Sequence, residues 1–125
     1  MSKRIIQTDK APKAIGPYSQ AIEANGFLYI SGQIPVNPAT GTIPEGIEAQ
    51  TEQVMKNIEA ILQEAGYTFK DVVKSTCLLS DIANFKAMNE IYAKYYVSEC
   101  PARAAFAVKD LPLGVLVEIE TIAGK

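Results

Sequence analysis

The chain of 125 residues contains no histidine and no tryptophan, and it has two cysteines, Cys77 and Cys100. Without histidine, Ser-His-Asp and Cys-His catalysis are excluded, and so is the commonest zinc ligand. Two cysteines this far apart form neither a metal-spaced pair nor a disulfide framework. Any proton transfer must therefore fall to Glu, Asp, Tyr, Lys or Cys side chains.

Long apolar runs and basic clusters are also absent. No apolar run reaches membrane-spanning length, and the N-terminal residues lack the apolar core of a signal peptide, so we expect a cytoplasmic protein without membrane contact. The net charge is −2, and no Lys/Arg run is longer than Lys3-Arg4, which argues against nucleic acid as a partner. The hydrophobic fraction of 48% supports one packed domain spanning residues 1–125, with a core of ordinary size.

The periodicity of the sequence predicts six strands and two helices. Asn25-Gly26 between apolar runs predicts a hairpin, and Gly66 predicts the end of a long helix. A second helix begins after Asp81 or Asn84, either of which can cap it, and ends before Pro101. The expected strands are 4–7, 18–24, 27–33, 72–79, 103–108 and 115–123, and the expected helices are 47–65 and about 85–95.

The resulting order, β-β-β-α-β-α-β-β, is typical of an α+β fold in which a mixed sheet has two helices on one face. The opposite face would then be uncovered, although its strands carry many apolar or small residues. A monomer exposing that face would show a large apolar patch. We therefore expect other copies of the chain to cover it.

One arginine stands out in residues 101–108 (PARAAFAV), a run that is otherwise small and apolar. Arg103 keeps its charge at any working pH and presents a planar fork of donors that fits a carboxylate. The following run, 115–123, offers Glu118 and Glu120 on one face, and the turn between the two runs suits a hairpin.

Two interpretations of Arg103 follow. In one, it forms a cross-strand ion pair with a glutamate that only stabilises the sheet. In the other, it holds the carboxylate of a substrate while Glu118 handles protons on an adjacent water molecule. The pattern alone does not choose between them.

Tyr18, Gly32 and Asn89 are further candidate site residues because of their local sequence. Gly16-Pro17 stiffens its loop and aims Tyr18 in a fixed direction, either into a site or over the core. Gly32 at a strand end indicates a close approach to the backbone or a bulge. Asn89 lies at the edge of an apolar helix face, so its amide reaches either a site rim or solvent.

Four segments together resemble the RidA family, also called the YjgF family. They are residues 14–20 (AIGPYSQ), 31–35 (SGQIP), 101–103 (PAR) and 117–120 (VEIE), and the likeness runs from about residue 5 to residue 123. The resemblance implies a chorismate-mutase-like α+β fold and a homotrimer with sites between subunits. It also implies an enamine/imine deaminase without metal or organic cofactor. Such an enzyme hydrolyses 2-aminoacrylate and 2-imino acids (2-iminopropanoate, 2-iminobutanoate) to 2-oxo acids and ammonia.

The resemblance also assigns roles to individual residues. Arg103 would bind the substrate carboxylate, Glu118 would activate water, and Tyr18 would close the pocket. Positions that would contact the substrate are Ser31, Gly32, Asn89 and, through its backbone N–H, Ala105. Many relatives have a cysteine where this chain has Ala105, so a thiol contribution there is lost.

Two other functions remain open in the sequence. The same pocket could bind 2-oxo acids or other small carboxylates without catalysis, as a regulatory module. Some relatives have been credited with RNA cleavage or inhibition of translation, but the acidic charge, the missing basic stripe and the missing histidine argue against this activity here. Glu120 shares a face with Glu118, so spacing alone does not separate the two carboxylates.

Overall fold

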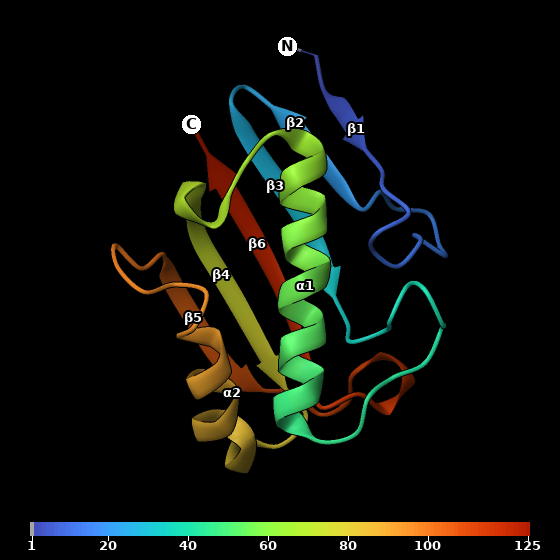
Figure 1. The fold of residues 1–125 in the computed structure, drawn as a ribbon, viewed down its shortest axis with the longest axis vertical. Coiled ribbons are helices and arrows are strands. Elements are labelled where there is room, and N and C mark those ends of the chain that lie inside the picture. The colour runs from blue at the N-terminus through green and yellow to red at the C-terminus, as the bar shows by residue number, and fades with distance from the viewer. Residues whose placement is uncertain (1) are drawn as a thin grey trace.

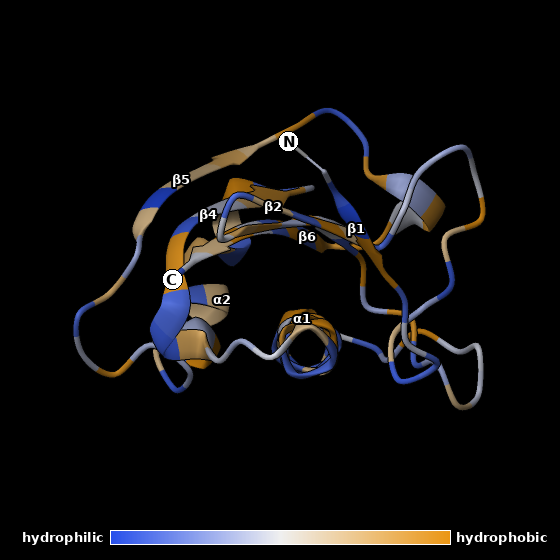
Figure 2. Ribbon diagram, turned by 90° about the horizontal axis from the view of Figure 1, so that it is seen from above, coloured by the Kyte–Doolittle hydropathy of each residue, from blue (hydrophilic) through white to orange (hydrophobic). Residues whose placement is uncertain are grey.

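The computed structural model describes residues 2–125. One six-stranded mixed sheet has the strand order β1-β2-β3-β6-β4-β5, and both helices lie on the same side of it (Figure 1; Figure 2). In chain order the elements are β1 (Arg4–Ile6), β2 (Ala21–Ala24), β3 (Phe27–Gln33), α1 (Ile47–Ala65), β4 (Val72–Leu79), α2 (Phe85–Tyr92), β5 (Ala102–Ala107) and β6 (Val117–Gly124). The α+β class, the element order and the placement of both helices on one face are confirmed. No helix within residues 2–125 is long and apolar enough to cross a membrane.

The core lies between the sheet and the two helices. Helix α1 spans the predicted range and turns an apolar stripe towards the sheet, because its buried side chains recur at helical spacing. Val54, Ile58 and Leu62 are completely buried in this stripe. On the sheet, every second residue of β6 from Val117 to Ala123 points into the same core.

Two glycine-containing turns behave as predicted. Asn25 and Gly26 both adopt left-handed backbone conformations, with φ of 53° and 80°, which is the turn that matches the twist of an antiparallel hairpin. Strands β2 and β3 pair antiparallel on either side of it. At the end of α1, Gly66 has φ of 85° and donates its N–H to the carbonyl of Leu62.

The predicted hairpin between the last two strands is wrong. Strand β4 lies between β5 and β6, pairing parallel with β5 and antiparallel with β6. The crossover connection that contains α2 places β5 on the outer side of β4, parallel to it. The chain must then pass across β4 before it forms β6 in the interior of the sheet. A cross-strand ion pair between Arg103 and Glu118 or Glu120 is therefore excluded.

In Figure 2, α1 and α2 lie on one side of the sheet, and neither of them covers its other face. Large side chains exposed on this face are Ile5, Phe27, Tyr29 and Phe106. Strand β5 is an edge strand, and five of its six residues are exposed. We refer to this surface, with its four exposed side chains, as the open face.

Candidate functional site

Arg103 points to the helix side of the sheet, beneath α2. It pairs in register with Ser75 of β4, a fully buried residue that faces the core. Its Nη1 donates a hydrogen bond of 2.6 Å to Oδ1 of Asn89. The guanidinium carbon lies 4.9 Å from the ring centre of Tyr92 and 5.4 Å from that of Phe85. Asn89 therefore meets Arg103 directly, as its position at the edge of the apolar helix face allowed.

No carboxylate of residues 2–125 forms an ion pair with Arg103, which contacts an amide and two aromatic rings instead. By contrast, Arg4 is paired with Glu23 at 2.9 Å. A guanidinium carries five N–H donors, and the Asn89 oxygen accepts from one of its nitrogens. The charge of Arg103 thus remains available to an anion from outside the chain.

Ala105 lies two residues beyond Arg103 on the same face of β5 and pairs with Cys77 of β4. It is half-buried. Burial raises the pKa of the Cys77 thiol to about 11, although the positive charge of Arg103 acts in the opposite direction. Cys77 is therefore a protonated core thiol at neutral pH rather than a nucleophile.

Glu118 occupies the opposite face of the sheet. It pairs with Leu78 of β4, and its two neighbours in β6, Val117 and Ile119, are buried in the core. Glu118 itself is half-buried, and burial, followed by repulsion from Glu120, raises its pKa above that of an ordinary glutamate. A carboxylate with a raised pKa is suited to accept and release protons closer to neutral pH.

Gly32 allows the Glu118 carboxylate to lie directly against the backbone of β3. A Cβ atom at position 32 would overlap a carboxylate oxygen and would stand 2.9 Å from the carboxyl carbon. The pairing of β3 with β6 also shifts register between Ile30 and Gln33, so the chain is irregular at this glycine. Both readings of Gly32, a close approach and a bulge, are confirmed.

Ser31 ties the end of β3 to the loop that carries Tyr18. Its Oγ donates a 2.6 Å hydrogen bond to the carbonyl of Ser19, and its N–H donates to the carbonyl of Gln20 at 2.9 Å. Tyr18 lies just before β2, which begins at Ala21 and not at residue 18 as predicted. Its side chain is 52% exposed, so it does not act as a lid on the core.

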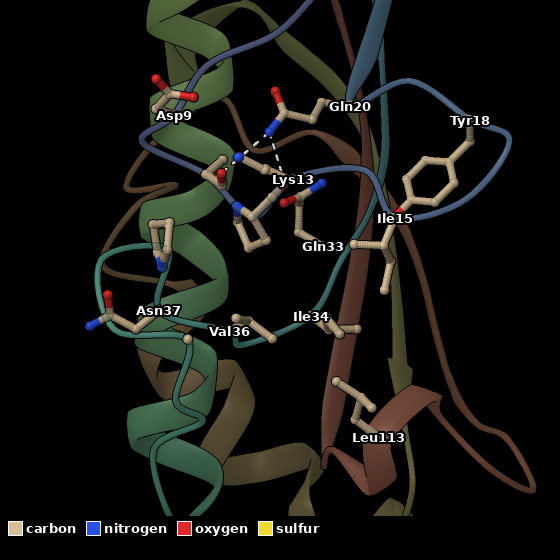
Figure 3. Close-up of a pocket in the computed structure, with 15 residues that line it drawn as sticks. Asp9, Lys13, Ile15, Tyr18, Gln20, Gln33, Ile34, Val36, Asn37 and Leu113 are labelled. Atoms are coloured by element: carbon tan, nitrogen blue, oxygen red, sulfur yellow. Dashed lines mark hydrogen bonds between the residues drawn. The ribbon is translucent and has the colours of Figure 1, made fainter.

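A cavity of about 510 Å³ opens beside this end of β3 (Figure 3). Tyr18 and Gly32 line it, but Glu118 and Arg103 do not. Gln20 braces the cavity wall, because its amide nitrogen donates hydrogen bonds to the carbonyls of Thr8, Ala11 and Pro12. The sequence did not predict these hydrogen bonds of Gln20, since a buried glutamine within a strand-like run gives no local signal.

The expected site residues therefore form two groups. The first, which we call the arginine half-site, comprises Arg103, Asn89 and Ala105 on the helix side of the sheet edge. The second, the glutamate half-site, comprises Glu118, Gly32, Ser31 and Tyr18 around the end of β3. Because the sheet separates them, one chain does not bring Arg103 and Glu118 together. No signal in the sequence pointed to the contact of Phe85 and Tyr92 with Arg103, and that contact was missed.

No cluster of three or more Cys, Asp or Glu side chains suited to holding a metal ion occurs within residues 2–125. The chemistry available in the two half-sites is thus that of a free guanidinium, a half-buried carboxylate, a phenol and backbone groups.

Comparison with known proteins gives consistent matches over the full length. The family described as Endoribonuclease L-PSP matches residues 8–125. The RutC family protein of Pyrococcus horikoshii is 55% identical over 124 residues, covering 98% of both chains. The 2-iminobutanoate/2-iminopropanoate deaminase of Capra hircus is 51% identical over 122 residues, covering 97% of this chain and 89% of the relative. The crystal structure of E. coli TdcF with bound serine superposes with a TM-score of 0.94 at 38% identity, covering 98% of each chain.

Proposed function

The chain belongs to the RidA (L-PSP, RutC) family, and from this premise we propose that it is a 2-iminobutanoate/2-iminopropanoate deaminase. It would hydrolyse 2-aminoacrylate and related 2-imino acids to 2-oxo acids and ammonia. The observation that carries the proposal is the unneutralised guanidinium of Arg103, set in an otherwise small and apolar strand. The serine in the TdcF structure is itself a small α-carboxylate, which is consistent with a substrate of this class.

Arg103 would bind the substrate carboxylate. A bidentate pair between guanidinium and carboxylate fixes both the position and the orientation of the substrate. Asn89 occupies one side of the guanidinium, and the backbone N–H of Ala105, on the same face of β5, would donate to the carboxylate as well. With the carboxylate held, the reacting C2 carbon has a defined position for attack by water.

Glu118 would activate that water. As the water oxygen forms a bond to C2 of the protonated imine, Glu118 accepts a water proton and the C=N π electrons move to nitrogen. The protonated Glu118 then returns a proton to the amine. The C–N bond breaks and ammonia leaves, while the C2 hydroxyl gives its proton to the Glu118 carboxylate and becomes the carbonyl of the 2-oxo acid. An imine carbon is already electrophilic, so one carboxylate of raised pKa is a sufficient base.

Two subunits would build each site. Arg103 and Glu118 lie on opposite faces of one sheet, so a substrate that touches both must lie between two copies of the chain. Such a contact joins two different surfaces, and contacts of this kind form rings when the rotation between neighbouring copies closes. The exposed apolar side chains of the open face and the exposed edge strand β5 support burial against neighbouring copies. We therefore propose a homotrimer with sites at its subunit interfaces.

The remaining residues of the glutamate half-site would shape the pocket. Tyr18 would close it and hydrogen-bond near the reacting carbon, since its phenol is exposed beside the cavity of Figure 3. Ser31 holds the Tyr18 loop through the Ser19 carbonyl, and Gly32 provides the space that the Glu118 carboxylate occupies.

A coupled assay tests the proposal. A dehydratase generates 2-aminoacrylate, and the rate of pyruvate release is measured with and without this protein. We expect Arg103→Ala to lower kcat/KM by about a hundredfold, because charge-assisted hydrogen bonds to the carboxylate are lost. Glu118→Gln should lower kcat by at least about a hundredfold through loss of the base. Arg4→Ala, which removes a guanidinium already paired with Glu23, is the matched control.

The outcomes separate the three functions. If Arg103→Ala accelerated imine breakdown as much as the wild-type protein does, the role of the guanidinium would be refuted. Tight binding of 2-oxobutyrate without any acceleration by the wild-type protein would identify a carboxylate-binding module instead. Salt-sensitive RNA cleavage that disappears in Glu118→Ala would identify a ribonuclease.

A further inference from the structure

Helix α2 presents one continuous face to the guanidinium of Arg103. Phe85, Asn89 and Tyr92 are spaced four and three residues apart, so they lie on the same side of the helix. Each of the three touches the guanidinium, two with ring faces and one with an amide oxygen. Helix α2 thus sets both the plane of the Arg103 guanidinium and its rotation within that plane.

Of the two rings, Tyr92 is the closer and the more fixed. Its ring centre lies 4.9 Å from the guanidinium carbon, against 5.4 Å for Phe85. Tyr92 is 6% exposed, whereas Phe85 is only half-buried, and a second aromatic ring, that of Tyr96, packs against Tyr92 with centroids 4.6 Å apart. Tyr92 therefore offers Arg103 a rigid surface, whereas the guanidinium itself is exposed.

The hydroxyl of Tyr92 makes no well-formed hydrogen bond within residues 2–125, and the same holds for the equally buried hydroxyls of Tyr96 and Ser75. Ser75 is nevertheless a nearby hydrogen-bonding group for both tyrosines, and it opposes the burial that raises the pKa of each. The Tyr92 hydroxyl therefore belongs to a cluster of buried hydroxyls, whereas its ring contacts Arg103. The ring is the part of Tyr92 that can act on Arg103.

We propose that Tyr92 is a positioning residue, whose ring face holds the guanidinium of Arg103 in the plane needed to bind a substrate carboxylate. The inference rests on the proposed function, in which Arg103 binds that carboxylate. A guanidinium on a flexible stem would otherwise lose rotamer freedom on binding, and a preformed orientation removes that penalty. Asn89 fixes the rotation within the plane by accepting from Nη1, which leaves the other donors for the ligand.

Three variants separate positioning from packing. Tyr92→Leu removes the ring, and Tyr92→Phe removes only the hydroxyl. Tyr67→Leu is the control, because Tyr67 is a tyrosine of 1% exposure whose ring contacts Lys125 and not Tyr92 or the guanidinium. Tyr92→Leu and Tyr67→Leu should both lower the melting temperature, since each leaves a cavity in the core.

Three measurements are made on each full-length variant. We expect Tyr92→Leu to raise KM for 2-aminoacrylate, and to weaken the binding of pyruvate measured by calorimetry, by about fivefold to thirtyfold with kcat little changed. Tyr92→Phe should recover most of that loss, and Tyr67→Leu should keep KM close to the wild-type value. The NMR signal of the Arg103 Nε–H, identified by its disappearance in Arg103→Lys, should lose its ring-current shift in Tyr92→Leu and keep it in Tyr92→Phe.

Equal effects of Tyr92→Leu and Tyr67→Leu on KM, or an unchanged Arg103 signal in Tyr92→Leu, would overturn the inference. The NMR signal reports the orientation of Arg103 whether or not the protein is a deaminase. If Arg103→Ala retained full activity, the proposed function would fail. Loss of the ring-current shift and of pyruvate affinity in Tyr92→Leu would in that case still support positioning of a carboxylate-binding arginine.

Discussion

Gly32 allows the Glu118 side chain to lie where it does, because only a glycine leaves room for the carboxylate beside the backbone of β3. The carboxylate occupies the space where any other residue at position 32 would place its Cβ atom. The backbone of Gly32 does not adopt a left-handed conformation, so the requirement for glycine there is one of space alone.

We predict that Gly32→Ala moves the Glu118 carboxylate and removes most of the activity. The loss should appear in kcat, by about a hundredfold if the base is fully displaced. Pyruvate binding through Arg103 should persist, because Arg103 lies on the other face of the sheet. Kinetics and calorimetry on the same preparation check both parts. Gly46→Ala is the control, since it lies outside the cavity and a Cβ there meets open space, so that variant carries only the strain of a positive φ; a similar loss of kcat in that variant would contradict the explanation.

The raised pKa of Glu118 predicts a pH-dependent penalty on folding. Burial and the neighbouring Glu120 make the folded chain hold this proton more tightly than the unfolded chain does. Stability therefore falls as pH rises from the ordinary glutamate value of about 4.3 through the folded-state pKa. Glu118→Gln, which cannot ionise, should be more stable than the wild type at pH 7, and the difference should vanish below about pH 4.

Urea unfolding of both proteins at pH 7 and near pH 4 measures this difference. Glu120→Gln is the companion variant, because it removes the second cause of the shift while leaving Glu118 in place. Its gain at pH 7 should be smaller than that of Glu118→Gln, since burial is the larger cause. A constant difference between wild type and Glu118→Gln across the pH range would contradict the assignment.

Elements whose limits depend on local chemistry could be predicted from the sequence. The limits of α1 follow from its apolar stripe and from Gly66, and the β2–β3 hairpin follows from Asn25-Gly26. The pairing of β5 could not be predicted in this way. A turn containing proline and glycine suits a hairpin, but the crossover through α2 places β5 beyond β4, and no local signal records this long-range pairing.

The same limit applies to the site. The sequence alternation placed Glu118 and Glu120 together on one face of β6, which is confirmed by the burial of the residues between and beside them. It could not tell which face Arg103 takes, because that depends on the register of β5 against β4 and on contact with α2. The contact of Phe85 and Tyr92 of α2 with the guanidinium likewise depends on tertiary packing.

Gly66 provides a test of an element boundary. Its φ of 85° is unfavourable for any residue with a Cβ atom, although a Cβ there would meet no other group. We predict that Gly66→Ala lowers the free energy of unfolding by about 1 kcal/mol, measured by urea denaturation. Glu64→Ala, an exposed substitution in the last turn of the same helix, should change it by less than about 0.5 kcal/mol. Equal losses would show that the left-handed conformation is not the cause.

The open face is the surface through which we expect whole molecules to associate. Tyr29 is 47% exposed on β3, and Phe27 packs near it with ring centroids 6.4 Å apart, so two large apolar side chains face outwards together. Such a surface is stabilised when another copy covers it.

We predict that Tyr29→Glu breaks the proposed homotrimer, because an unpaired charge buried in an interface is destabilising by several kcal/mol. Sedimentation should then give the 13.5 kDa mass of one chain, whereas the wild type should give three times that mass. Gln63→Glu, on the exposed side of α1, introduces the same charge away from the sheet and should leave the trimer intact. Because each site is shared, activity should fall with the trimer. A monomeric wild type would refute the shared site.

The separation of Arg103 and Glu118 by the sheet also has a genetic consequence, which is complementation between two inactive chains. In the proposed ring of three, each pocket would take its arginine from one subunit and its glutamate from the next. When Arg103→Ala and Glu118→Gln chains are refolded together in equal amounts, every ring containing both kinds has one junction where the two intact residues meet. About a quarter of wild-type activity should therefore return from two preparations that are each inactive. Mixed rings without any recovery would mean that a single chain supplies both residues.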